Sequence, residues 1–252
     1  MTFLPNFFII GAAKAATTSL SSLLRQHPEA AIAKNKEPHF FSVSYRKGWD
    51  YYADFFKHCS GAKAIGDAST SYSRIRQNPE VIGRIKRAIP DAKIIYMVRH
   101  PLERIESAYV EHLCSPKVQL FESINDAVIR QPMLVNSSRY WEVFSAYRDA
   151  FGESRIMVIW FEDYISRTGE IFRDVCRFLE IDDGFIPDLN KERTNSRTIA
   201  AIRMAKHGRD VIQINTQWDR ETRMAVINQI RDDNCRFLAH FGRPKNYWGD
   251  FL

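Results

Sequence analysis

Near its N-terminus the chain reads FFIIGAAKAATTSLSSLL over residues 7–24. An apolar strand is followed by a tight turn of small residues with one lysine, and then by an amphipathic helix that opens with three hydroxyl residues. The start of a helix presents backbone N–H groups and the positive end of the helix dipole, so it attracts an anion. The segment therefore predicts a strand–turn–helix unit that binds a phosphate group.

The side chains of this turn favour the same function. Lys14 adds a full positive charge, and the small residues around it leave room for a ligand to approach the backbone. The hydroxyl groups of Thr17, Thr18 and Ser19 can cap the helix and donate hydrogen bonds to phosphate oxygens. The alternative is an ordinary strand-to-helix connection with an N-cap threonine, which needs neither the lysine nor three consecutive hydroxyls.

The turn is similar to a nucleoside-triphosphate loop but does not fit its pattern. GxxxxGK[ST] requires Gly-Lys at the end of the turn, where this chain has Ala16-Thr17. A triphosphate enzyme also needs an acidic residue for magnesium, commonly at the end of a later strand. The strand expected at residues 92–98 ends instead in Arg99. A cation at this place favours a second anionic group on the ligand.

Arg99 precedes a helix whose first turn is marked by Pro101. The end of a strand in an open α/β sheet is where such folds bind ligands, so Arg99 is a candidate ligand-binding residue. Arg104 and Ser107 are three residues apart and share one helix face, which lets Ser107 converge with Arg99 on one phosphate. For Arg104, an ion pair with a neighbouring glutamate on a solvated face is an equal alternative.

Four segments together resemble the sulfotransferases that use 3′-phosphoadenosine 5′-phosphosulfate (PAPS), most closely the heparan sulfate sulfotransferases and their bacterial relatives. They are FFIIGAAKAATTSLSSLLRQHP at the start, KEPHFFS at 36–42, MVRHPLERIESAY at 97–109 and the closing LAHFGRPKNYW. The resemblance implies that Arg99 and Ser107 hold the 3′-phosphate of PAPS. It also implies that the 5′-phosphosulfate is held by Lys14, Ala15, Ala16, Thr17, Thr18 and Ser19.

The resemblance also places a catalytic base at Glu37. Sulfuryl transfer to a hydroxyl requires loss of the acceptor's proton, and a partly buried carboxylate can remove it. Pro38 disfavours helical geometry at Glu37, and an aromatic pair after it anchors the segment. His39 is the rival base, because imidazole titrates near neutral pH, with an orienting or substrate-facing role as the other possibility. Lys14 is expected to act in catalysis too, by following negative charge onto the bridging oxygen as the S–O bond breaks.

Two features concern the acceptor and the nucleotide. Where the heparan sulfate enzymes carry a second active-site lysine, this chain has Ala68, which argues against a heavily anionic acceptor. In the family, basic residues of a stretch comparable to LNKERTNSRTIA fold over the nucleotide. That resemblance adds Arg193 and Arg197 as candidates for the 3′-phosphate, with an exposed basic linker as the alternative.

Length and pattern predict the fold class. At 252 residues with 45% hydrophobic content the chain can bury a large core as one domain over residues 1–252. Strand candidates FFII, KAIG, KIIYMV and RIMVIW alternate with helical stretches, including amphipathic ones at 77–90 and 121–150. This order is typical of an α/β fold with a central parallel sheet flanked by helices. The resemblance makes that sheet a P-loop-like nucleotide-binding fold.

Composition limits the function classes. The four cysteines form no metal or redox motif, and no metal site is expected. No stretch approaches the roughly 20 apolar residues of a membrane span, so we expect a cytoplasmic enzyme. The net charge of +6 is mixed with 30 acidic residues and no nucleic-acid motif, which favours a small nucleotide or acidic glycan over nucleic acid.

The sequence thus predicts a PAPS-dependent sulfotransferase that acts on a hydroxyl acceptor, a saccharide or glycolipid. A non-sugar alcohol acceptor, a small-molecule kinase with a degenerate phosphate loop, and a non-catalytic anion-binding module are the alternatives. Neither the identity of the acceptor nor the oligomeric state can be predicted from these residues.

Overall fold

The computed structural model describes residues 4–35, 37–113, 123–190 and 215–251. The described residues fall into two compact units. The first lies within Met1–Arg99 and Val143–Glu192, and the second within His100–Glu142 and Arg193–Leu252. The single domain expected over residues 1–252 stays a prediction.

The first unit is built on a parallel sheet. Its five strands have the order β2-β3-β1-β4-β5 in the described part of the chain, and all four neighbouring pairs are parallel. The strands are β1 (Phe7–Gly11), β2 (Ala30–Ile32), β3 (Ala64–Asp67), β4 (Lys93–Val98) and β5 (Ile156–Trp160). The predicted α/β class is confirmed, and so are the four expected strands. The three-residue β2 is too short to leave an alternating pattern in the sequence.

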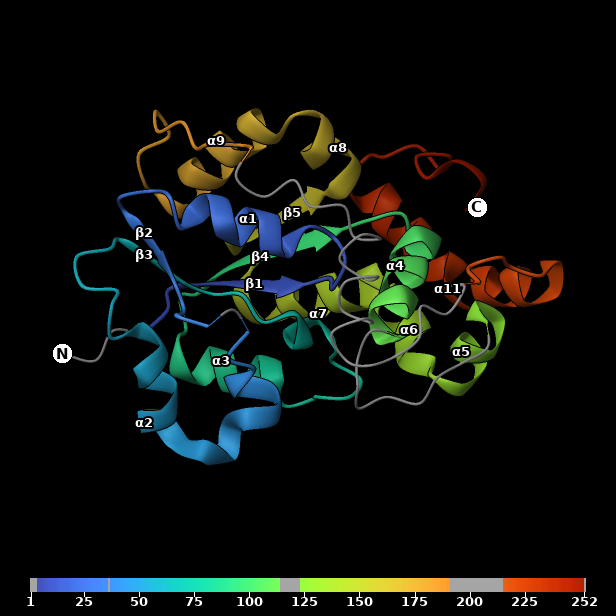
Figure 1. The fold of residues 1–252 in the computed structure, drawn as a ribbon, viewed down its shortest axis with the longest axis horizontal. Helices are drawn as coiled ribbons and strands as arrows, with labels where there is room; N and C mark the ends of the chain where they lie inside the picture. The colour runs from blue at the N-terminus through green and yellow to red at the C-terminus, as the bar shows by residue number, and fades with distance from the viewer. Residues whose placement is uncertain (1–3, 36, 114–122, 191–214, 252) are drawn as a thin grey trace. The chain divides into compact units, whose positions relative to one another are not determined.

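Helices cover both faces of this sheet. In Figure 1, α1 and α9 lie on one side of the strands and α3 on the other. All five residues of β1 are therefore buried, which explains its unbroken apolar run. The α-helices that belong wholly to this unit are α1 (Thr17–Leu24), α2 (Gly48–Ala53), α3 (Val81–Ala88), α8 (Phe161–Ser166) and α9 (Thr168–Leu179). Short helical turns are η1 (Phe40–Ser44), η2 (Tyr45–Lys47), η3 (Asp54–Phe56), η4 (Thr70–Ser73) and η5 (Glu153–Arg155).

An aromatic cluster fills the space around η1 and α2. Phe40 stacks on Tyr52 with 4.2 Å between ring centroids, and both side chains are buried. Trp49 contacts Phe40 from the side yet keeps 44% of its surface exposed. The aromatic residues of this segment are thus divided between core and surface.

The second unit is helical in its described part. It contains α4 (Pro101–Leu113), α5 (Ile124–Arg130), α6 (Pro132–Asn136), α11 (Arg220–His240) and η6 (Gly249–Phe251). Helix α7 (Tyr140–Phe151) begins in this unit and ends in the first. The stretch predicted as one helix over 121–150 is therefore interrupted twice, first at Pro132, which begins α6, and again before Tyr140.

A buried arginine joins the helices of the second unit. Arg104 is 1% exposed and donates its Nε–H to the hydroxyl of Ser138 at 2.6 Å and a second N–H to the carbonyl oxygen of Leu134. The side-chain amide of Asn234 donates to the backbone oxygen of the same Ser138 at 3.0 Å. The solvated alternative for Arg104 is wrong, because the residue is buried and connects α4 to Leu134 of α6 and to Ser138, which Asn234 of α11 also contacts.

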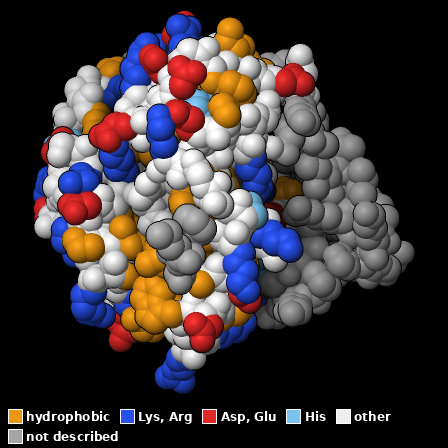
Figure 2. All heavy atoms as spheres, turned by 90° about the vertical axis from the view of Figure 1, so that its left-hand side faces the viewer, with side chains coloured by type: hydrophobic (Ala, Val, Ile, Leu, Met, Phe, Trp, Pro, Cys, Tyr) orange, Lys and Arg blue, Asp and Glu red, His pale blue; other side chains and the backbone are white. Residues whose placement is uncertain are grey.

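The surface mixes charges of both signs. On the face in Figure 2, lysine and arginine side chains alternate with aspartate and glutamate. Among the described helices, none is long and apolar enough to cross a membrane. Cys59, Cys176 and Cys235 carry free thiols, and Cys114 lies outside the described residues. The cytoplasmic location stays a prediction.

Candidate active site

Each strand of the sheet delivers one candidate segment at its carboxyl end. The turn of residues 12–16, called the lysine turn below, follows β1. The segment that contains Glu37 follows β2, and residues 68–73 follow β3. Arg99 follows β4, and α8 follows β5. Because the strands are parallel, these ends meet at one edge of the sheet, where open α/β folds bind their ligands.

The turn after β1 is shaped to approach a ligand closely. Ala12 and Ala15 are fully buried, and the N–H of Ala12 donates to the carbonyl oxygen of Met97 in β4 at 2.6 Å. Lys14 and Ala16 adopt the left-handed region with φ of 75° and 68°. These contacts fix the turn against the sheet before any ligand binds.

Helix α1 starts differently from the sequence prediction. Its N-cap residue is Ala16, and no side chain caps the helix, so the hydroxyl residues do not act as caps. Thr17 is buried, Thr18 is exposed and Ser19 is half-buried. An N-terminus without a side-chain cap offers its first N–H groups to an anion.

Only glycine fits at the end of β1. A Cβ atom on Gly11 would lie 2.4 Å from the hydroxyl oxygen of Ser73, and the φ of Gly11 is +139°. The lysine turn therefore packs directly on η4, the helical turn after β3.

Arg99 lies beside the same turn. One guanidinium N–H donates to the carbonyl oxygen of Lys14 at 3.5 Å, and the guanidinium carbon is 4.5 Å from the centroid of the Phe161 ring. The structure thus brings the strand-end arginine to the lysine turn. Ser107 is half-buried in α4 of the second unit, and its convergence with Arg99 stays a prediction. Arg193 and Arg197 lie outside the described residues.

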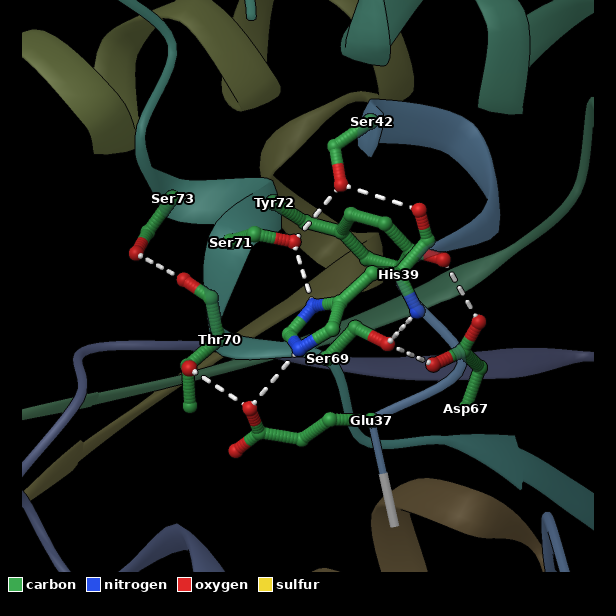
Figure 3. A network of polar contacts seen from close by, with 9 residues as sticks. All are labelled: Glu37, His39, Ser42, Asp67, Ser69, Thr70, Ser71, Tyr72 and Ser73. Carbon is green, nitrogen blue, oxygen red and sulfur yellow. Dashed lines mark hydrogen bonds and ion pairs between the residues drawn. The ribbon is translucent and has the colours of Figure 1, made fainter. Parts of the chain in front are cut away.

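The two candidate bases contact each other (Figure 3). Glu37 Oε2 is 3.2 Å from His39 Nε2, and about a quarter of the Glu37 side chain and a third of the His39 side chain are exposed. The Thr70 hydroxyl donates to the same Glu37 oxygen at 3.3 Å. On the other side of the ring, His39 Nδ1 is 2.7 Å from the Ser71 hydroxyl, which is 2.7 Å from that of Ser42. Both His39 and Thr70 thus contact the Oε2 atom of Glu37, whose side chain is half-buried.

A buried carboxylate, Asp67, is connected to the Glu37–His39 pair through Ser69. Asp67 is fully buried and accepts hydrogen bonds from Tyr52, Tyr72 and Ser69 at 2.8, 2.7 and 2.6 Å. Ser69 in turn accepts the backbone N–H of His39 at 2.9 Å. Burial raises the pKa of Asp67, and the three donors oppose that shift. Asp67 therefore fixes the backbone of His39 through Ser69.

Backbone strain is concentrated in these segments. Among the described residues, five non-glycine residues have positive φ, and four of them are Lys14, Ala16, Glu37 and His39, with Glu180 as the fifth. Such conformations cost of order 1–3 kcal/mol each and persist where the surrounding structure enforces them, often at functional sites.

The chain matches a known family over more than half of its 252 residues. A sequence model described as the sulfotransferase family covers residues 43–185. The chain belongs to the sulfotransferase family. This confirms the resemblance inferred from the four motifs and decides for sulfotransfer over the kinase alternative. The matched range begins after Glu37 and the lysine turn, so it leaves their roles untested.

Two curated relatives are named for similar chemistry. The membrane-associated sulfotransferase kil1 of Dictyostelium discoideum is 36% identical over 109 residues, 42% of this chain and 22% of that protein. Human heparan sulfate glucosamine 3-O-sulfotransferase 3B1 is 36% identical over 122 residues, 48% of this chain and 30% of that protein. The chain thus spans less than a third of the length of these two relatives.

Solved structures agree with the fold. A sulfotransferase from Alicyclobacillus acidocaldarius superimposes with a TM-score of 0.77 at 28% identity, covering 98% of this chain and 99% of the other. Mouse sulfotransferase SULT7A1, complexed with PAP, gives a TM-score of 0.54 at 12% identity over 94% of this chain and 88% of the other, and shows the fold alone. The P-loop-like sulfotransferase fold is confirmed.

Proposed function

We propose that this sulfotransferase uses PAPS as donor and transfers its sulfuryl group to the hydroxyl group of a saccharide. The observation that carries the proposal is the contact between Arg99 and the lysine turn. Two cations at one sheet edge, one on the turn and one at the end of β4, suit a ligand with two separate anionic groups. PAPS is such a ligand, with a 5′-phosphosulfate and a 3′-phosphate.

The strand order supports an orientation for the donor. In the sheet, β1 lies between β3 and β4. The lysine turn therefore has β3 and β2, with the Glu37 segment, on one side and Arg99, at the end of β4, on the other. We infer that the phosphosulfate sits on the turn, with the nucleoside and 3′-phosphate toward Arg99. The acceptor then approaches from the β2–β3 side, where about a quarter of the Glu37 side chain is exposed.

In the proposed reaction the acceptor oxygen bonds to sulfur while the bond from sulfur to the bridging phosphate oxygen breaks. The acceptor proton passes to Glu37, and adenosine 3′,5′-bisphosphate leaves. Lys14 stabilises the negative charge that develops on the bridging oxygen. The group transferred is a sulfuryl unit, and no electrons are exchanged with an outside oxidant or reductant.

His39 is proposed as the residue that orients the base. A neutral His39 donates from Nε2 to Glu37 and accepts from Ser71 at Nδ1, which satisfies both ring nitrogens. When both ring nitrogens carry a hydrogen, Nδ1 can donate to the Ser71 hydroxyl, and Ser71 then donates to the Ser42 hydroxyl. Ser42 in turn donates to the carbonyl oxygen of His39 at 3.1 Å. The hydroxyl chain thus matches either state of the ring by rotation alone and keeps His39 in place, while the acceptor proton stays on Glu37.

The names of the relatives support a saccharide acceptor, and Ala68 supports an acceptor with a low negative charge. Two of the matched proteins are named for heparan sulfate and for carbohydrate substrates. Ala68 is fully buried, so no cation reaches the acceptor from that position. We therefore propose a saccharide or glycolipid of lower negative charge than heparan sulfate.

The proposal is tested by calorimetry and turnover. Wild-type protein is expected to bind adenosine 3′,5′-bisphosphate more tightly than 5′-AMP, and Arg99→Ala to lose most of that preference. Glu37→Gln is expected to keep the nucleotide affinity while sulfation, followed as the mass gain of one sulfuryl group on a panel of saccharides and simple alcohols, falls at least 100-fold. Equal wild-type affinity for the two nucleotides would refute the PAPS assignment.

A further inference from the structure

The short helix α8 contacts both groups proposed to bind the donor. The ring of Phe161 lies against the Arg99 guanidinium, 4.5 Å from centroid to carbon. One turn later, the hydroxyl of Tyr164 is 2.9 Å from the hydroxyl of Ser19 in α1. Tyr164 is only 2% exposed, so its hydroxyl is held in place by the surrounding core. One helix therefore touches the residues assigned to the two ends of the nucleotide.

We propose that Phe161 and Tyr164 are positioning residues for the donor nucleotide. Phe161 fixes the Arg99 guanidinium for the 3′-phosphate, and Tyr164 fixes the Ser19 hydroxyl for the 5′-phosphosulfate. This inference rests on the proposed function, because it takes the donor to be a nucleotide with phosphates at both positions.

Strand register explains why Phe161 meets Arg99. Val98 at the end of β4 pairs with Trp160 at the end of β5, and the chain leaves both strands at the next residue. Arg99 and Phe161 are those next residues, so they emerge side by side from adjacent parallel strands. The pairing of the two strands thus places the ring face against the guanidinium.

Stacking on the ring restricts a flexible side chain. A planar guanidinium lying on an aromatic face keeps its N–H donors at the rim, directed within its own plane. One of them donates to the carbonyl oxygen of Lys14 at 3.5 Å. With the Phe161 ring against the guanidinium and one N–H held by Lys14, the Arg99 side chain has fewer orientations open to it before the ligand arrives, which lowers the entropy lost on binding.

The Tyr164 hydroxyl controls the direction of a hydrogen bond. Either partner of the Ser19–Tyr164 bond can donate. The oxygens of a phosphosulfate are acceptors only, so the ligand selects the arrangement in which Tyr164 donates and Ser19 turns its own hydrogen to the ligand. Without Tyr164, the Ser19 hydroxyl loses the partner that holds it in this orientation.

The two roles predict different binding signatures, measured by titration calorimetry of the full chain with adenosine 3′,5′-bisphosphate and with 5′-AMP. Phe161→Leu removes the aromatic face and is expected to lower the preference for the 3′-phosphorylated nucleotide by about 3- to 30-fold, the range of a cation–π contact. Phe161→Tyr keeps the face and is expected to retain the preference within about 2-fold. Tyr164→Phe is expected to weaken both nucleotides about 2- to 10-fold, as for one hydrogen bond, and to leave their ratio unchanged.

The control lies on the same helix. Ile165 directly follows Tyr164 and is 56% exposed, and Ile165→Ala is expected to change neither affinity nor ratio. Should Phe161→Leu melt too low for titration, Phe161→Met takes its place with the same expected ratio. If Phe161→Leu keeps the full wild-type preference for the 3′-phosphorylated nucleotide, the proposed role of Phe161 is overturned. If Tyr164→Phe changes the ratio of the two affinities, the proposed role of Tyr164 is overturned. A wild type without preference overturns the PAPS proposal itself, so the two failures are distinguishable.

Discussion

Tyr52 and Tyr72 allow a matched test of the network beneath the proposed base. Both hydroxyls donate to Oδ2 of Asp67, at 2.8 and 2.7 Å, and both side chains are buried. The difference is that the Tyr72 hydroxyl also accepts the backbone N–H of Phe41 at 3.3 Å. Tyr52→Phe removes one hydrogen bond, whereas Tyr72→Phe removes two and leaves a buried N–H without that acceptor.

The expected losses follow from these contacts. A hydrogen bond to a charged acceptor contributes about 1.5–3 kcal/mol, and a buried donor that loses its acceptor costs about 1–3 kcal/mol. We therefore expect Tyr52→Phe to lower the free energy of unfolding by about 2 kcal/mol. For Tyr72→Phe we expect about 1 kcal/mol more. Since Phe41 lies two residues beyond His39, Tyr72→Phe is also expected to lower turnover more than Tyr52→Phe does.

Urea denaturation at neutral pH measures both losses. Tyr51 is a half-buried tyrosine of the same helix α2, in edge-to-face contact with Phe55, and Tyr51→Phe serves as control with an expected change within about 0.5 kcal/mol. Equal losses in Tyr52→Phe and Tyr72→Phe, or a larger loss in Tyr52→Phe, would refute the argument that the Phe41 N–H depends on Tyr72.

Two further predictions concern a glycine and a carboxylate. Gly11→Ala places a Cβ atom against Ser73 at a residue with positive φ. We expect it to lower the free energy of unfolding, measured by thermal denaturation, by about 1–3 kcal/mol. Gly169→Ala serves as the control, because a Cβ atom there would have no atom within 4 Å. Asp233 accepts the N–H groups of Trp141 and Glu142 at the start of α7, and burial raises its pKa to about 6. Because the pKa is higher in the folded state, the stabilisation by Asp233 is fully present below about pH 4 and is lost as the pH rises through 6. The free energy of unfolding of the wild type minus that of Asp233→Asn should therefore fall between about pH 4 and pH 6. A difference that does not change with pH would contradict this prediction.

The sequence predicted the parts of the site that depend on local chain order. A strand, small residues with one lysine, and a helix must bring backbone N–H groups to the end of the strand, and the structure has this arrangement in Phe7–Gly11 and Thr17–Leu24. Arg99 could be placed at a strand end for the same reason. The cap was wrong because Ala16, in a left-handed conformation, already turns the chain into the helix.

Contacts between distant segments left weaker signals. Thr70 and Ser71 reach the Glu37–His39 pair from a different strand, and only the run of hydroxyl residues after a strand hinted at a polar role. The contact between Phe161 and Arg99 depends on the register of β4 and β5, which no local pattern reports. Arg104 is buried against Leu134 and Ser138, about 30 residues further along the chain, and its own neighbours gave no sign of this.

The η4 turn connects the two halves of the proposed chemistry. The Thr70 side chain donates to Glu37, while its carbonyl oxygen accepts the hydroxyl of Ser73, whose Oγ occupies the space a side chain on Gly11 would need. Glu37, the proposed base, and the end of β1 that leads into the lysine turn are thus both tied to the four residues of η4. Sulfuryl transfer benefits from this rigidity, because the attacking oxygen, from which the base removes a proton, and the leaving oxygen must lie on opposite sides of one sulfur atom. The parallel sheet supplies it by bringing the ends of β1, β2 and β3 to the same edge.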